Sequence, residues 1–94
     1  MSLNGKIYTL HYNDSIVTLE LNFTLTVTSG NNEIGQFGTL IGEDLLPNVG
    51  VQIGVVGSSY LLAYLSSGGK LGVLNTSNST ITGNIKATLM WRKV

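Results

Sequence analysis

Acid–base and metal chemistry in proteins depends mainly on carboxylates, histidine and cysteine, and this chain holds few of them. Its only adjacent acidic pair is Glu43-Asp44, shortly before Pro47. A calcium cage takes about six to eight oxygen ligands, and a glycosidase needs two carboxylates on either side of the scissile bond. Because the whole chain has five acidic residues, we interpret Glu43 and Asp44 as parts of a solvated loop.

Nucleophilic catalysis is disfavoured for the same reason. The chain has no cysteine and one histidine, His11, which excludes disulfides, thiolate metal sites and a cage of several imidazoles. A Ser-His-Asp triad would need His11 with Asp14 or Asp44, and no Gly-x-Ser-x-Gly turn is present. The glycines match neither phosphate-binding pattern. We predict no enzyme activity, no catalytic residue, no metal and no cofactor, and a half-buried or interface position for His11.

Aromatic residues are the better candidates for a binding function. An exposed tyrosine or tryptophan ring can stack against the apolar face of a sugar, while amides and hydroxyls bind the sugar's OH groups. The alternative for each ring is packing in the core or at a subunit interface. The candidate sugar contacts are Tyr60, Tyr64 and Trp91, with polar loops at Asn31-Asn32 and Asn75–Ser79.

The composition describes one small domain, residues 1–94, with an unusually uncharged surface. Charged residues make up 11% of the chain, against about 25% in typical soluble domains. Contacts between identical subunits are poor in charge, so we expect a homo-oligomer. The formal net charge is zero and no basic stripe is present, so nucleic acid is not an expected partner.

No targeting or membrane signal is found in the sequence. The first residues contain no apolar h-region, so we expect no signal peptide. No apolar run approaches the length of about 18 residues that a membrane span needs, so membrane insertion is not expected. The sequence leaves open whether the chain is a fragment of a longer protein.

The strongest structural signal is a period-two alternation of apolar and polar residues, typical of strands with one buried face. It covers Ser15–Thr28 and returns in Ile81–Trp91, where Gly83 is expected to mark a bulge or a close backbone approach. A helical turn is expected around Glu43–Leu46, ended by Pro47. Shorter strands are expected at Lys6–Tyr12, Ile34–Leu40, Val51–Val56, Tyr60–Leu65 and Lys70–Leu74. About seven strands separated by Gly, Asn and Ser turns predict an all-β antiparallel sandwich or a barrel.

Several short segments of the chain together form a recognisable pattern of strands and turns. They are Leu21-Asn-Phe-Thr-Leu25, Ile34-Gly-Gln-Phe-Gly-Thr-Leu40, Gly54-Val-Val-Gly57, Ala63-Tyr-Leu-Ser66, Gly68-Gly-Lys-Leu71 and Asn75–Leu89. Through these segments the chain resembles, from about Ser15 to Trp91, the small distal head domains of tail-fibre, baseplate and receptor-binding proteins from phages and prophages of Gram-positive bacteria. Such sequences tend to read Gly-Thr-Leu-Pro before their loop, whereas Ile41-Gly42 follows Leu40 here.

This resemblance implies an antiparallel β-sandwich of jelly-roll or TNF-like character that forms a homotrimer. It also implies attachment to a host cell-surface saccharide, contact with other tail or baseplate proteins, and a place at the tail tip of the virion after assembly in the cytoplasm. It transfers no individual binding residue. The main hypothesis is therefore a trimeric receptor-binding head. The alternatives are a structural virion or fibre-assembly domain without a ligand and, least favoured, a glycan-active enzyme domain.

Overall fold

The two segments with the longest alternation pair with each other along their whole length. In the computed structural model, which describes residues 2–3, 6–37 and 43–93, β4 (Ile16–Val27) and β9 (Ile81–Arg92) are antiparallel and matched over all 12 positions. Leu25 stands opposite Gly83 in an unbroken register, so the bulge expected at Gly83 is not formed. This pair is the largest strand contact in the fold.

Seven strands form two antiparallel sheets, which confirms the predicted all-β sandwich. One sheet has the order β3-β4-β9, and the other has the Greek-key order β5-β8-β7-β6, a unit from which jelly rolls are also built. A short hairpin of two further strands precedes them. The remaining bounds are β1 (Ser2–Leu3), β2 (Lys6–Ile7), β3 (Thr9–Tyr12), β5 (Gly30–Gln36), β6 (Val51–Gly54), β7 (Leu61–Leu65) and β8 (Lys70–Asn75).

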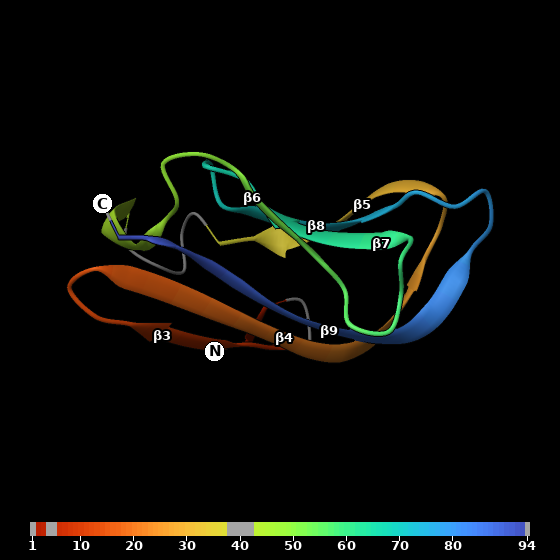
Figure 1. Cartoon of the computed structure of the whole chain (residues 1–94), viewed down its shortest axis with the longest axis horizontal. Coiled ribbons are helices and arrows are strands. Elements are labelled where there is room, and N and C mark those ends of the chain that lie inside the picture. Colours follow the sequence, from red (N-terminus) through yellow and green to blue (C-terminus); the bar gives the residue numbers. More distant parts are fainter. Residues whose placement is uncertain (1, 4–5, 38–42, 94) are drawn as a thin grey trace.

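The two sheets lie face to face and enclose the core. Figure 1 views them edge-on, with β3 and β4 in the lower layer, β5, β7 and β8 in the upper layer, and β6 and β9 along the near side. The whole molecule measures 40 × 23 × 20 Å. In β4 and β9 the inward apolar side chains alternate with mostly polar outward ones, as the period-two pattern predicts, whereas the outward positions of β7 are Leu62 and Tyr64. The central core residues are Val17, Leu19, Leu21, Leu61, Ala63, Leu65, Leu71, Val73, Ile85, Ala87 and Leu89.

An aromatic cluster extends the core beside the central pair. The ring of Tyr8 packs edge-to-face against Phe23 and Phe37, with centroid distances of 5.5 and 5.2 Å. Phe37 and Tyr8 are almost fully buried. Burial raises the pKa of the Tyr8 hydroxyl from 10.0 to about 12, because the phenolate would lose its hydration there.

The segment after β4 turns back earlier than expected. Gly30 has a φ of 96°, which a glycine adopts without strain, and β5 starts at this residue instead of at Ile34. Asn31 and Asn32 therefore lie in a strand, not in the polar loop that was predicted, and a bulge falls between Glu33 and Gly35. The expected strand end at 38–40 lies outside the described residues.

The segment between β5 and β6 contains the expected helical turn. It is a 3₁₀ helix, η1 (Glu43–Leu45), and it ends ahead of Pro47, which has no N–H to continue it. In the part of the chain that the structure describes, no helix is long and apolar enough to cross a membrane.

Candidate functional site

The most strongly positioned aromatic ring on the surface is that of Tyr64, in β7 on the outer face of the four-stranded sheet. Its cross-strand neighbour in β8 is Gly72, and the ring occupies the space that a side chain at position 72 would need. The Tyr64 hydroxyl donates a hydrogen bond of 2.7 Å to Oδ1 of Asn31 in β5, on the far side of β8. A ring that reaches from β7 over β8 to β5 must lie along the sheet surface.

Gly72 makes this arrangement of the ring possible. A glycine inside a strand has no side chain to pack and usually weakens the sheet. Here the tyrosine from the next strand covers it, so that Gly72 is buried although it lies on the outer face. The glycine and the Asn31 hydrogen bond together fix the ring before any ligand arrives, while Tyr64 itself remains partly exposed.

Two polar side chains flank the ring in the same cross-strand row. The register places Gln52, Tyr64, Gly72 and Glu33 side by side on β6, β7, β8 and β5, with neighbouring strands about 4.8 Å apart. Gln52 and Glu33 are exposed, and neither side chain bonds to another of the described residues. The row thus offers a flat apolar surface with a free amide at one end and a free carboxylate at the other.

Tyr60 lies one residue before β7 and adds a second exposed ring. Its side chain is 55% exposed, and its carbonyl accepts hydrogen bonds of 2.8 Å from Thr76 N and 2.9 Å from Thr76 Oγ1. These bonds connect Tyr60 to the predicted polar loop Asn75–Ser79. The structure therefore brings these two candidates together at the start of the strand that carries Tyr64.

Trp91, the third predicted contact, lies on the inner face of the other sheet. It is 7% exposed, and its indole N–H donates a 3.0 Å hydrogen bond to the carbonyl of Leu45 in η1. A ring in this position packs against the core and cannot cover a sugar on the outer face with Tyr64. The structure therefore agrees with the alternative interpretation of Trp91, which is packing in the core.

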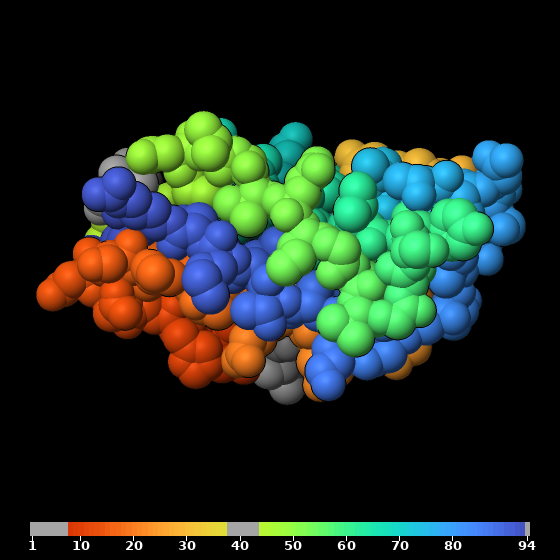
Figure 2. All heavy atoms as spheres, viewed as in Figure 1, coloured from red at the N-terminus to blue at the C-terminus, as the bar shows by residue number. Residues whose placement is uncertain are grey.

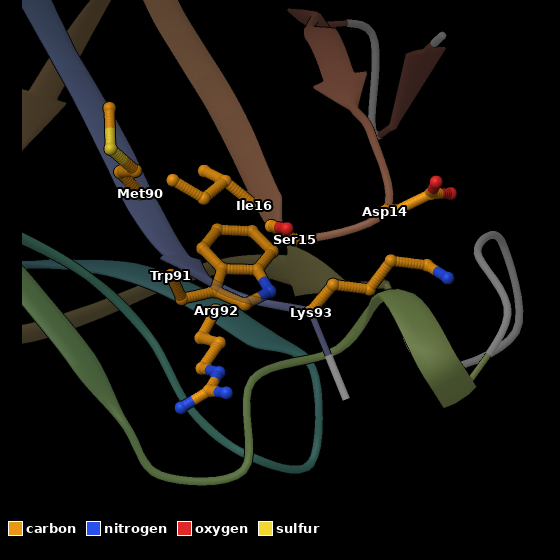
Figure 3. A pocket seen from close by; sticks show the side chains of 7 residues that line it. All are labelled: Asp14, Ser15, Ile16, Met90, Trp91, Arg92 and Lys93. Carbon is orange, nitrogen blue, oxygen red and sulfur yellow. The ribbon is translucent and has the colours of Figure 1, made fainter.

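A hollow of about 590 Å³ lies where β4 begins and β9 ends (Figure 3). Its apolar floor includes Ile16 and Met90, whose side chains are exposed. The charged groups around it do not converge: in Figure 3 the Arg92 guanidinium points away from Asp14, and Lys93 Nζ lies 3.8 Å from Asp44 Oδ2. The residues that line the hollow are Asp14, Ser15, Ile16, Met90, Trp91, Arg92 and Lys93.

The near side of the sandwich, between β6 and β9, has both apolar and polar side chains exposed. Figure 2 shows β9 running beside the segment around β6 on this side, and Val56 N–H donates a 2.8 Å hydrogen bond to Lys86 O. Val56 is nevertheless 66% exposed, and Ile53 and Met90 are also exposed. Gln52 of β6 and Lys86 and Thr88 of β9 are exposed as well.

The residues considered for catalysis are dispersed. His11 is exposed on β3, where its Nε2 lies 3.0 Å from Glu20 Oε2. Of the two predicted positions for His11, the half-buried one is therefore wrong, and the interface position stays a prediction. The alternation of β3 accounts for this, since Tyr8 and Leu10 take the inward positions and His11 the outward one. Across residues 2–3, 6–37 and 43–93, no three His, Cys, Asp or Glu side chains gather to hold a metal ion.

Comparison with protein-family models, curated protein sequences and solved structures found no match for this chain. The site must therefore be interpreted from its own geometry. Sequence reasoning named Tyr64 but missed Gly72, Glu33 and Gln52, since only the strand order and register place them beside the ring.

Proposed function

We propose that this domain is a non-catalytic receptor-binding head, which attaches a phage tail or baseplate fibre to saccharide on the host cell surface. The observation that carries the saccharide part is the Tyr64 ring, held flat between Gly72 and Asn31 with polar groups at both ends. Its chemistry matches a pyranose, which has an apolar face and a rim of hydroxyls. The resemblance of Ser15–Trp91 to distal head domains supports the place at the tail tip.

The same proposal includes a homotrimer that contacts other tail or baseplate proteins. The low charge of the chain supports self-association, as do the exposed apolar side chains of Ile53, Val56 and Met90. One flat ring gives weak binding, and three linked copies raise the overall avidity without any new contact. Size-exclusion chromatography with light scattering should give a mass in solution of three times the chain mass of 10.0 kDa.

The binding test compares two tyrosines on opposite sheets. Tyr64→Ala removes the flat ring, and Tyr12→Ala removes a ring that is 61% exposed on β3 and serves as the matched control. We expect the native chain and Tyr12→Ala to bind cell-wall polysaccharide from Gram-positive hosts, and Tyr64→Ala to lose this binding. Equal binding by all three proteins would exclude Tyr64 from the binding surface.

The exposed apolar side chains in and around β6 and β9 also favour a second candidate function, a structural fibre-assembly domain without a ligand. In that case Ile53, Val56 and Met90 would be buried between subunits or against another tail protein. A stable oligomer that binds no polysaccharide in the same assay would favour this second function.

A further inference from the structure

We propose that Glu33 and Gln52 select the ligand at the Tyr64 ring, and that the favoured ligand is an uncharged hexopyranose with neighbouring free hydroxyls. This inference rests on the proposed saccharide-binding function and adds the residue that discriminates between classes of sugar. Nothing in the sequence pattern identifies Glu33, because its partners in the row come from strands far away along the chain.

Glu33 lies at the hydroxyl end of the Tyr64 ring. Asn31 accepts the hydrogen bond from Tyr64, and Glu33 follows two residues later, on the same outward side of β5, before the bulge at Ile34. Glu33 is also the register partner of Gly72, over which the ring lies. A sugar stacked on the ring would therefore present its rim to the Glu33 carboxylate.

An ionised carboxylate only accepts hydrogen bonds, and its two oxygens can accept from two adjacent hydroxyls at once. Glu33 has no partner among the residues that the structure describes, so both oxygens are free for this role. At the other end of the ring, the Gln52 amide can both donate to and accept from a hydroxyl. The two ends together can orient one pyranose ring.

The same carboxylate disfavours acidic sugars and phosphate-bearing polymers. A ligand anion placed beside Glu33 would meet a like charge, which is a common source of specificity. The cation nearest along β8 is Lys70, two residues before Gly72 and opposite Gln36, so it belongs to the next outward row. Within the row of the ring, Glu33 is the sole charged residue, since its other members are Gln52, Tyr64 and Gly72.

In the test, the full chain is titrated with paired sugars and binding is followed by NMR. The sugars of each pair differ only at C6, where a carboxylate replaces the neutral hydroxymethyl group: glucose with glucuronate, and galactose with galacturonate. We expect at least one neutral hexose to bind at least about tenfold more tightly than its uronic acid, a ratio typical of one unfavourable charge contact. Glu33→Gln should reduce this ratio to below about threefold and should weaken the neutral sugar, because an amide offers one acceptor oxygen in place of two. Glu20→Gln, an exposed acid on the opposite sheet, is the matched control and should behave as the native chain does.

The outcomes separate this inference from the proposed function. One outcome is that the native chain binds sugars through Tyr64 while Glu33→Gln leaves the ratio of neutral-hexose to uronic-acid affinity unchanged. In that case the proposed role of Glu33 in selecting the sugar is wrong, and the saccharide-binding function stands. If uronic acids bind as well as neutral hexoses, the selection is likewise overturned. If the native chain binds none of the sugars and no host polysaccharide, both proposals fail together. Circular dichroism of each variant establishes that the fold is retained.

Discussion

The side-chain amide of Asn75 donates a hydrogen bond of 3.1 Å to the carbonyl of Val27 and so joins the two sheets at one end of the sandwich. The same Nδ2 donates to Ser79 O at 2.9 Å, while Oδ1 accepts from Ser77 N at 3.0 Å and Ser77 Oγ at 2.7 Å. Asn75 is 2% exposed, and among the described residues it is the one residue of polar or charged type that is buried. It holds the β8–β9 turn against the end of β4.

We predict that Asn75→Ala lowers the free energy of unfolding by about 2–4 kcal/mol, because buried carbonyls would lose their donor. Urea denaturation followed by circular dichroism measures this change. Asn78→Ala is the control, since Asn78 is exposed in the same turn and should change stability by less than about 0.5 kcal/mol. Equal effects of the two substitutions would contradict the role of the buried amide.

Gly72→Ala should remove binding while leaving the fold intact. The new methyl group would meet the ring of Tyr64, which must move away and lose its hydrogen bond to Asn31. A strand tolerates alanine better than glycine, so the free energy of unfolding should change by less than about 1 kcal/mol. Sugar titration should show at least about a tenfold loss of affinity. Unchanged affinity would show that the flat position of the ring is not needed.

Trp91→Phe should affect stability and leave sugar binding unchanged. The substitution removes the hydrogen bond to Leu45 O and some buried volume, and we expect a loss of about 1–3 kcal/mol. Because Trp91 is the chain's one tryptophan and is buried, fluorescence of the native protein should shift to longer wavelength on unfolding. A weaker sugar affinity in a folded Trp91→Phe protein would place this residue in the binding surface after all.

Tyr8 should make the fold sensitive to alkali. Burial raises its pKa to about 12 in the folded chain, above the value of 10.0 that applies once it is unfolded. Between these values the unfolded chain loses a proton that the folded chain retains. The contribution of the buried Tyr8 hydroxyl to the free energy of unfolding is therefore complete below pH 10 and declines towards pH 12. Urea denaturation between pH 10 and pH 12 should show a smaller decline in the free energy of unfolding for Tyr8→Phe than for the native protein. Tyr12 is exposed, so the free energy of unfolding of Tyr12→Phe should decline as much as that of the native protein.

The architecture could be predicted from the sequence because burial on one face of a strand imposes a period of two. The alternation in Ser15–Thr28 and Ile81–Trp91 indicated β4 and β9, and in both strands the apolar side chains at the odd-numbered positions point inward. The same alternation predicts the burial of Trp91, because Trp91 lies at an odd-numbered position, as do Ile85 and Leu89, and therefore points into the core. Its aromatic type suggested a ligand contact, whereas its position in the alternation determined its burial.

The site could be predicted only in part, because a strand pattern does not determine which strands become neighbours. Tyr64 could be chosen from its residue type. Its outward direction is known only from the structure, because the residues of β7, Leu61–Leu65, show no alternation of apolar and polar types. The order β5-β8-β7-β6 was needed to place Gly72 beneath the ring and Asn31 at its hydroxyl. Asn31 was expected in a loop, and the early start of β5 at Gly30 was not visible in a segment poor in apolar residues.

The pairing of β4 with β9 has a consequence for how the chain folds. Val27 meets Ile81 at one end of this pair and Ile16 meets Arg92 at the other, so most of the chain lies between the partners. Pairing of segments so distant along the chain requires closure of a long loop, and such topologies fold slowly. During synthesis, β4 leaves the ribosome well before its partner β9. Until β9 emerges, the apolar face and one edge of β4 stay uncovered. A chain truncated before Ile81 should therefore aggregate instead of folding partially.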